Sequence, residues 1–375
     1  MYLKELNLTN FKNYSDIKLS FSKKINCFTG QNASGKTNIL DAIYLLSLTK
    51  SFFNTPDKLM INSSGGNDFY SIIATYEINK SIESIQIKYV KGNRKILKRN
   101  DKEYPRLSDH IGLLPLVMIS PGDVFLISGG SDIRRRFLDI IISQFDKEYL
   151  HNLIQYNAAL KQRNAILKKM DFSHTSSMGL FEVWDQKLVE YGIPIFEKRK
   201  KMTDTLSAYF HRFYSNISND NNILTVEYKS QLFQKSLNQL LKNNFETDKY
   251  LRYTSVGIHK DDLEFKIDNL PLKKIGSQGQ QKSLLIALKL AEYEILKQGS
   301  NKKPILLLDD VFDKLDNFRV NKVIELVAEK DYGQIFITDT HMKRVEQIVT
   351  KLNVPASLFE IKSGTIKIYK DDNQK

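Results

Sequence analysis

The octet Gly30-Gln31-Asn32-Ala33-Ser34-Gly35-Lys36-Thr37 has the GxxxxGK[ST] spacing of a phosphate-binding loop. Such a loop needs a strand that leads into it and a helix that leads out. Residues 24–29 (KINCFT) have the β-branched and aromatic content of a short strand, and residues 38–46 (NILDAIYLL) have the apolar spacing of a helix. These flanks disfavour a chance match or a purely structural turn, and predict a working loop in an α/β fold.

The residue types of the octet suit the phosphates of a nucleotide. Glycines let the backbone approach an anion, and successive amides face it together with the helix N-terminus. Lys36 is expected to reach the outer phosphates and Thr37 to ligate magnesium. The nucleotide-binding residues predicted in this way are Gly30, Gln31, Asn32, Ala33, Ser34, Gly35, Lys36, Thr37 and Asn38.

The composition sets broad limits on the class of protein. With 375 residues the chain is long enough for a large core in two lobes. No apolar run approaches the roughly 20 residues that a membrane span needs, and the first residues lack a signal-peptide pattern. The single cysteine, Cys27, excludes an internal disulfide and offers no metal cluster. We expect a soluble cytoplasmic protein that does not act at a membrane.

The formal charge of +13 leaves two interpretations open. Binding to a phosphate backbone would release counterions and give sequence-independent affinity for nucleic acid. A generally lysine-rich composition explains the same charge equally well. Basic residues gather at residues 91–99 and 198–201, but such runs are more often solvated faces than binding sites.

The apolar patterns divide the chain into two predicted lobes. The spacing is helical from Ser131 to about Tyr214, which indicates a largely helical insertion. We therefore expect an ATPase lobe formed by residues 1–120 and 291–375, and an inserted lobe formed by residues 121–290. Residues 253–256 (YTSV) carry a strand-like signal within the insertion.

Two adjacent carboxylates follow a short apolar run near the C-terminus. The run Ile305-Leu306-Leu307-Leu308 predicts a buried strand, and Asp309 and Asp310 follow at its carboxyl end. A phosphate-binding loop needs a distant acid of this kind to hold magnesium and to polarise water. We assign Asp309 to the metal and Asp310 to the attacking water. The alternative, two acids that cap the following turn, is less suited to a chain with such a loop.

The segment Gly276-Ser277-Gln278-Gly279-Gln280-Gln281 directly precedes an apolar helix pattern. Small residues and a hydroxyl at a helix N-terminus suit a γ-phosphate. Their order, after the octet and before Asp309, resembles the ABC ATPase superfamily, in which the signature of one subunit closes over nucleotide held by another. The resemblance implies a signature that acts in trans (Ser277, Gln278, Gly279 and Gln280), a D-loop at residues 313–316 that contributes Asp316, and a switch histidine at His341. The predicted catalytic residues are Lys36, Asp309, Asp310 and His341.

The resemblance narrows to the RecF family of bacterial recombination and repair ATPases, and it covers nearly the whole chain. The matching elements are Leu8-Thr9-Asn10-Phe11-Lys12-Asn13-Tyr14, Ser120-Pro121-Gly122-Asp123, Arg134-Arg135-Arg136-Phe137-Leu138-Asp139, Gly257-Ile258-His259-Lys260-Asp261-Asp262 and Ser277-Gln278-Gly279-Gln280-Gln281. The last two are the most specific. The resemblance implies an ABC-type P-loop ATPase head, similar to an SMC head without long coiled-coil arms, with an inserted helical lobe.

What the family does becomes an expectation for this chain. The resemblance implies that ATP, with Mg²⁺, drives homodimerisation on DNA at single-strand/duplex junctions or on duplex. Slow, DNA-stimulated hydrolysis would then release the DNA. It also implies RecR as a partner, with RecO and RecA in the same pathway, so that RecA is loaded at single-strand gaps.

Some residues depart from the pattern that the resemblance implies. Lys12 and Phe53 stand where arginine is common in the family, and Asp310 replaces the glutamate of most ABC ATPases. No glutamine ends residues 113–119 as a transporter Q-loop would, so the second magnesium ligand stays open. The alternatives are the ATPase subunit of an ABC transporter, which the missing glutamine disfavours, and a long-armed chromosome-organising protein, which the absence of sustained heptads disfavours.

Overall fold

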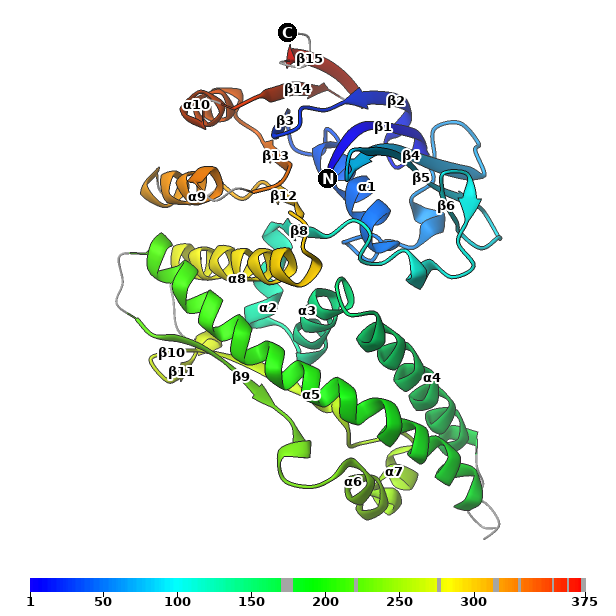
Figure 1. Cartoon of the computed structure of the whole chain (residues 1–375). Helices are drawn as coiled ribbons and strands as arrows, with labels where there is room; N and C mark the ends of the chain where they lie inside the picture. The colour runs from blue at the N-terminus through cyan, green and yellow to red at the C-terminus, as the bar shows by residue number, and fades with distance from the viewer. Residues whose placement is uncertain are drawn as a thin grey trace. The chain divides into compact units, whose positions relative to one another are not determined.

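A computed structural model describes residues 1–169, 178–218, 222–274, 278–312, 317–329, 332–352, 354–362 and 364–371. The chain forms two compact units. The first comprises Met1–Asp123, Asn216–Ser218 and Lys282–Lys375, and the second comprises Val124–Ser215 and Asn219–Gln281. The lobe boundaries predicted at residues 121 and 290 stay predictions, while these units divide at Asp123 and Lys282. Figure 1 shows an α/β unit with two sheets and a mainly helical unit, the architecture expected from the sequence.

The first unit contains a six-stranded sheet that carries the phosphate-binding octet. Its strand order is β15-β14-β3-β13-β12-β8, and all neighbours are parallel except β14 and β15. The strands are β3 (Ile25–Thr29), β8 (Leu116–Ile119), β12 (Ile305–Asp309), β13 (Ile335–Asp339), β14 (Ala356–Lys362) and β15 (Thr365–Asp371). Strands β3, β8, β12 and β13 are buried throughout, as expected for parallel strands covered on both faces.

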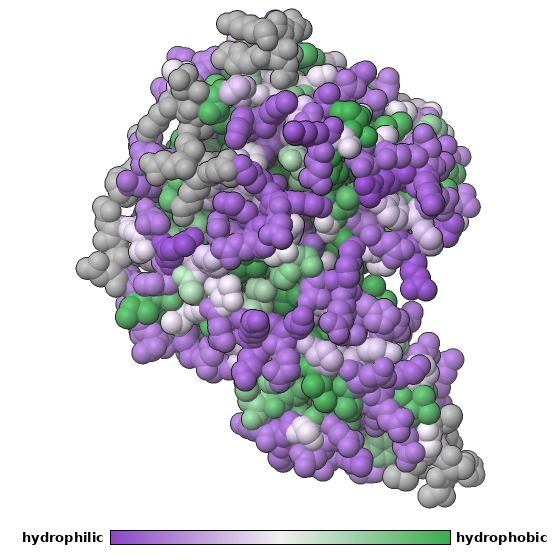
Figure 2. Space-filling model, in the orientation of Figure 1, coloured by the Kyte–Doolittle hydropathy of each residue, from purple (hydrophilic) through white to green (hydrophobic). Residues whose placement is uncertain are grey.

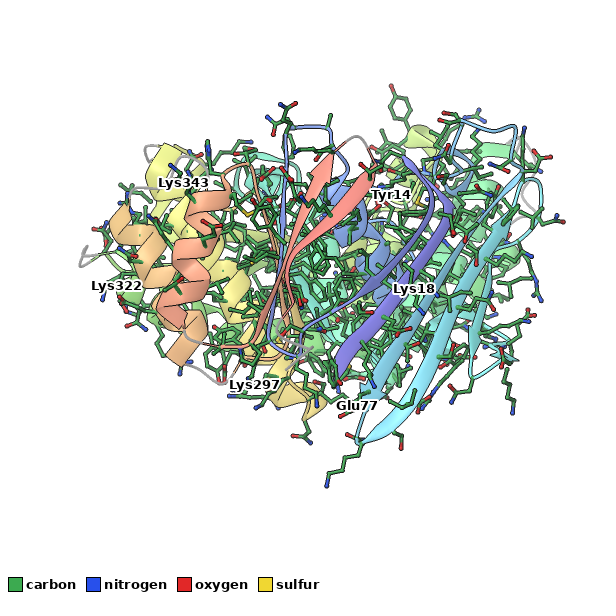
Figure 3. The ribbon with its side chains drawn as sticks, turned by 90° about the horizontal axis from the view of Figure 1, so that it is seen from above. Tyr14, Lys18, Glu77, Lys297, Lys322 and Lys343 are labelled. Atoms are coloured by element: carbon green, nitrogen blue, oxygen red, sulfur yellow. The ribbon has the colours of Figure 1, made fainter. Side chains whose placement is uncertain are left out.

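A second, antiparallel sheet of the same unit has the order β2-β1-β4-β5-β6-β7. Its strands are β1 (Tyr2–Phe11), β2 (Tyr14–Ser20), β4 (Phe69–Ile78), β5 (Ser81–Val90), β6 (Ile96–Arg99) and β7 (Lys102–Glu103). Buried and accessible residues alternate along β4 and β5, because one face of the sheet packs on the core. Figure 3 shows Tyr14 and Glu77 toward opposite ends of this sheet.

Helix α1 (Lys36–Leu48) contacts strands of both sheets and contributes to their shared hydrophobic core. On the parallel sheet, Phe28 of β3 stacks against Phe336 of β13 and Phe359 of β14. The other helices of this unit are α8 (Gln278–Ser300), α9 (Asn317–Glu329) and α10 (Met342–Leu352); α8 belongs to it only from Lys282 onward. Helix α10 packs against β3 and β13. This packing fixes the strand ends from which the functional side chains project.

The second unit consists of helices and a three-stranded antiparallel sheet of order β11-β10-β9. The strands are β9 (Leu224–Lys229), β10 (Asp262–Ile267) and β11 (Leu270–Pro271). The helices are α2 (Phe125–Ser128), α3 (Ser131–Ser143), α4 (Lys147–Lys169), α5 (Met178–Ile217), α6 (Leu237–Asn243) and α7 (Phe245–Leu251), and the last residues of α5 fall in the first unit. The predicted helical insertion is therefore present, with a small sheet added to it.

The strand expected at residues 253–256 is wrong. Side chains, not a neighbouring strand, satisfy the backbone there: the Thr254 amide donates to Asn164 Oδ1 and the Ser255 amide donates to Asp248 Oδ1, both at 2.8 Å. Arg163, which is fully buried, donates to Asp248 at 2.7 Å and to the Thr254 hydroxyl at 2.9 Å. A buried polar network thus replaces the sheet ladder that the β-branched residues suggest.

No helix in the described ranges is long and apolar enough to cross a membrane. Figure 2 shows a mainly hydrophilic face with small apolar groups. Most large apolar side chains of the chain lie in the core instead.

Candidate nucleotide-binding site

The octet connects the buried strand β3 to the first turn of α1. Gly30 and Gly35 have φ values of 154° and 117°, in the region that favours glycine. A side chain at Gly30 would collide with the Ile361 carbonyl, and one at Gly35 would collide with the Asn13 and Tyr14 side chains. At these two glycines the loop backbone therefore lies directly against Ile361 of β14 and against Asn13 and Tyr14 at the turn between β1 and β2. The absence of side chains there lets the loop amides approach an anion.

Lys36 points back over the loop. Its ammonium donates to the carbonyl oxygens of Gly30 and Gln31 at 2.8 and 3.0 Å, and the residue is only 4% exposed. These neutral acceptors hold the positive charge where the phosphates of a nucleotide would lie. Contact of Lys36 with the outer phosphates stays a prediction.

Thr37 and Asp309 meet although 272 residues separate them. The Thr37 hydroxyl donates to Asp309 Oδ1 at 2.9 Å, and the Thr338 hydroxyl of β13 donates to the same oxygen at 2.8 Å. Burial raises the pKa of the Asp309 carboxyl, while the bonds from Thr338 and Thr37 oppose that shift. One hydroxyl and one carboxylate are hard oxygen donors that fit Mg²⁺, an ion that retains several of its waters.

Asp310 directly follows the metal-side carboxylate. Its amide donates to the Thr338 hydroxyl at 2.9 Å, its φ is 46°, and the residue is half-buried. His341 is exposed after β13, and its amide donates to Asp339 Oδ1 at 2.8 Å. In the described part of the chain the His341 ring forms no hydrogen bond to Asp309 or Asp310. The structure brings Lys36, Thr37 and Asp309 together, whereas His341 contacts Asp339 through its backbone amide.

The remaining predicted residues are described only in part. Gln278, Gly279 and Gln280 are the first residues of α8. Ser277 and Asp316 lie outside the described residues. Their expected action on a second copy stays a prediction.

Two side chains that the sequence did not single out as supports hold the octet from the turn between β1 and β2. Asn13 Nδ2 donates to the Ser34 carbonyl at 3.1 Å, and Asn38 Nδ2 donates to Asn13 Oδ1 at 2.7 Å. The Tyr14 hydroxyl donates to the Gly35 carbonyl at 3.0 Å. Their place in the segment Leu8 to Tyr14 was the available signal, but the contact depends on the tertiary fold.

The other RecF-like elements of the inserted lobe bind one another. Arg134 pairs with Asp262 through two bonds of 2.7 and 2.9 Å, and Arg135 donates to the Asp261 carbonyl at 2.6 Å. Arg199 is buried, pairs with Asp139 at 2.8 Å and donates to the Ile258 carbonyl at 2.9 Å. These arginines stabilise the second unit, whereas Arg136 is exposed.

His259 in this network gives a pH prediction. Its Nε2 lies 3.0 Å from the Thr254 carbonyl and its Nδ1 lies 2.8 Å from the Tyr156 hydroxyl, which suits a neutral ring. Burial lowers the pKa of His259 to about 4 from 6.5. Between about pH 6.5 and pH 4 the histidine is protonated in the unfolded chain and neutral in the folded chain. The free energy of unfolding should therefore fall as pH drops through this range, by up to about 1.4 kcal/mol per pH unit.

Urea unfolding followed from pH 7.5 to 4.5 measures this effect. His259→Gln keeps a donor and an acceptor but cannot titrate, so its unfolding midpoint should depend less on pH than that of the wild type. Equal pH dependence of the two proteins would contradict the assignment.

Several residues of the basic runs at residues 91–99 and 198–201 form ion pairs. Lys95 pairs with Asp57 at 2.8 Å and Arg99 with Glu83 at 2.7 Å, while Lys198 pairs with Asp146 at 2.6 Å. Part of their charge is therefore compensated within the protein, while Lys200 and Lys201 are exposed.

Comparison with known proteins identifies the family. The model of the RecF/RecN/SMC N-terminal domain matches residues 2–363. A DNA replication and repair protein RecF of Flavobacterium johnsoniae is 48% identical over 96% of this chain and 100% of its own length. The chain belongs to the RecF family. A second RecF, of Parabacteroides distasonis, is 47% identical over 98% of this chain and 99% of its own.

Solved structures agree with the RecF family membership. A structure of the recombination mediator protein RecF with ATP, in the RecFOR pathway, has a TM-score of 0.88 at 30% identity and covers 98% of both chains. An Smc head domain from Pyrococcus furiosus has a TM-score of 0.58 at 16% identity, over 98% of this chain and 95% of its own, and shares the fold. The RecF relationship supports an ABC ATPase head of the RecF type and decides against the transporter alternative.

Proposed function

We propose that this chain is an ATP-dependent DNA-binding protein of recombinational repair and replication restart. The observation that carries the proposal is the hydrogen bond from Thr37, the last residue of the phosphate-binding octet, to Asp309, in a chain of the RecF family. The activity would be a weak ATPase, stimulated by DNA, that forms ADP and phosphate in the cytoplasm.

Each residue of the site has a role in this proposal. Residues 30–38 would bind ATP, with Lys36 on the outer phosphates. Thr37 and Asp309 would hold Mg²⁺, which would neutralise phosphate charge when bound. Asp310 would orient and deprotonate the attacking water, and the exposed His341 would contact the outermost phosphate. The bond from the Asp310 amide to the Thr338 hydroxyl would hold the backbone that carries this carboxylate.

A second copy of the chain would complete the site. Ser277, Gln278, Gly279 and Gln280 of one copy would close over the nucleotide of the other, and Asp316 would touch the opposite site. ATP would thereby favour a homodimer, and hydrolysis would open it. The turnover per molecule should rise steeply with protein concentration, whereas a total rate that is merely proportional to concentration would count against shared sites.

The dimer would bind DNA at single-strand/duplex junctions or on duplex, and would act with RecR, and with RecO, to load RecA at single-strand gaps. The basic balance of the chain and the RecF relationship support this part of the proposal. Mass measurement with ATP or ADP, in the presence of gapped, duplex or single-stranded DNA, tests it directly.

ATP should produce dimers, and DNA should stabilise them. The affinity of the ATP form for DNA should fall steeply with salt, with a log–log slope of about −0.9 per duplex phosphate neutralised. Salt-insensitive binding, or equal dimerisation with ADP, would contradict the proposal. Lys36→Ala serves as the matched protein that should dimerise with neither nucleotide.

A further inference from the structure

The ring of Phe53 is exposed beside Lys12, although the preceding ring is packed. Phe53 is 44% exposed. The Phe52 ring meets Tyr44 of α1 edge-on at 5.1 Å, and the Phe53 ring meets Phe52 at the same distance. One aromatic side chain thus anchors the segment to α1 while the next presents its ring to solvent. A single exposed phenylalanine is common on protein surfaces, so a functional role must be argued from the residues around it.

The turn that carries Phe53 is firmly held. The Asp41 carboxylate accepts bonds from the Ser51 hydroxyl at 2.8 Å and from the Phe52 amide at 2.7 Å. The Phe53 amide donates to the Ser51 hydroxyl at 3.2 Å, and the Asn54 amide donates to the Ser51 carbonyl at 3.2 Å. The exposed ring therefore has a fixed backbone, which lowers the conformational entropy that the protein would lose when a ligand binds to it.

Lys12 links this turn to the octet. Its ammonium pairs with Asp41 at 2.6 Å and lies 5.6 Å from the centre of the Phe53 ring. The next residue, Asn13, holds the Ser34 carbonyl and the side chain of Asn38. The Phe53 ring and the octet are therefore fastened to the same two-residue stretch.

The position of Asp41 on α1 is consistent with the expected course of a bound nucleotide. Asp41 lies four residues after Thr37, one turn and about 6 Å along the helix axis. Phosphates bound by the loop amides would end at Thr37 and Asn38, so a nucleoside that continues from the innermost phosphate would meet the turn held by Asp41. That distance is comparable to the length of a ribose.

We propose that Phe53 is the stacking platform for the nucleobase of bound ATP, with Lys12 placed between the platform and the phosphate loop. The inference deepens the proposed ATP-binding function and rests on it. An aromatic ring stacks on the face of a purine without reading its edge, so Phe53 supplies affinity for the base and no hydrogen-bond selectivity. Lys12 is a positioning residue, because its charge is already paired with Asp41.

The test compares two ligands that differ in the base. ATP and inorganic tripolyphosphate, each with Mg²⁺, are titrated by calorimetry into the full-length wild type and Phe53→Ala. The variant should bind ATP about 5-fold to 100-fold more weakly, the range expected for one aromatic–base stack. Its affinity for tripolyphosphate should be unchanged. Phe53→Trp should retain ATP affinity, and ATP should quench its added indole fluorescence while tripolyphosphate does not.

Phe233→Ala is the matched control, because Phe233 is a similarly exposed phenylalanine, 51% exposed, in the second unit. It should bind both ligands as the wild type does. Equal losses for ATP and tripolyphosphate in Phe53→Ala would show a disturbed loop and overturn the stacking role, as would unchanged ATP affinity. Failure of the wild type itself to bind ATP would instead overturn the proposed function, and the platform with it.

Discussion

Replacing Lys36 with alanine should lower the affinity for ATP by about 100-fold or more. The ammonium is buried against the Gly30 and Gln31 carbonyls at 2.8 and 3.0 Å, so it already faces the space above the loop. Hydrogen bonds to charged groups contribute about 1.5–3 kcal/mol each, and the variant loses at least two of them to the phosphates. Calorimetric titration with ATP measures the loss.

Lys24→Ala is the control for this prediction. Lys24 is an exposed lysine that directly precedes the first residue of β3, whereas the octet follows the last residue of that strand. It removes the same charge from the chain without touching the loop, and should bind ATP as the wild type does. Normal ATP binding by Lys36→Ala would remove the basis for a phosphate-binding loop. Similar thermal unfolding of the two variants would show that Lys36→Ala is folded.

Asp310→Asn should reduce the rate of ATP hydrolysis by about 100-fold or more while ATP binding and the ATP-dependent dimer persist. An amide cannot accept the proton of the attacking water, and a positioned general base typically contributes 10²–10⁴-fold. The Asp310 amide donates to the Thr338 hydroxyl, so a neutral side chain of the same size should leave the backbone there intact. Single-turnover hydrolysis and mass measurement on the same sample separate the two effects.

Asp309→Asn is the contrasting variant. Asp309 accepts bonds from Thr37 and Thr338, so its replacement should weaken Mg²⁺-dependent ATP binding as well as hydrolysis. Rapid hydrolysis by Asp310→Asn would refute the role assigned to that residue. Loss of ATP binding in both variants alike would show that the two carboxylates do not divide the work.

The octet and the Asp309-Asp310 pair were predictable because each belongs to a short local pattern. A glycine-rich turn after a strand, and acids after an apolar run, need no knowledge of distant contacts. The meeting of Thr37 with Asp309 follows from the order of β3, β13 and β12, since parallel strands present their carboxyl ends at one edge.

Other features depend on contacts that the sequence does not display. Asn13 and Tyr14 support the octet only because the turn between β1 and β2 folds over it. Strands β14 and β15 were not predicted, although β14 is the parallel neighbour of β3. The strand expected at residues 253–256 failed because buried side chains offered the backbone better partners than a strand did.

The position of β3 between β13 and β14 affects when this part of the protein can fold during synthesis. Ile25 pairs with Ile335 on one side and Ala356 on the other, so the strand that feeds the octet gains its neighbours only when the end of the chain exists. At translation rates of about 5–20 residues per second, the octet waits roughly 15–60 s on the ribosome before it can fold. A prematurely terminated chain would carry the whole octet but lack the strands that flank β3, so we expect it not to bind nucleotide.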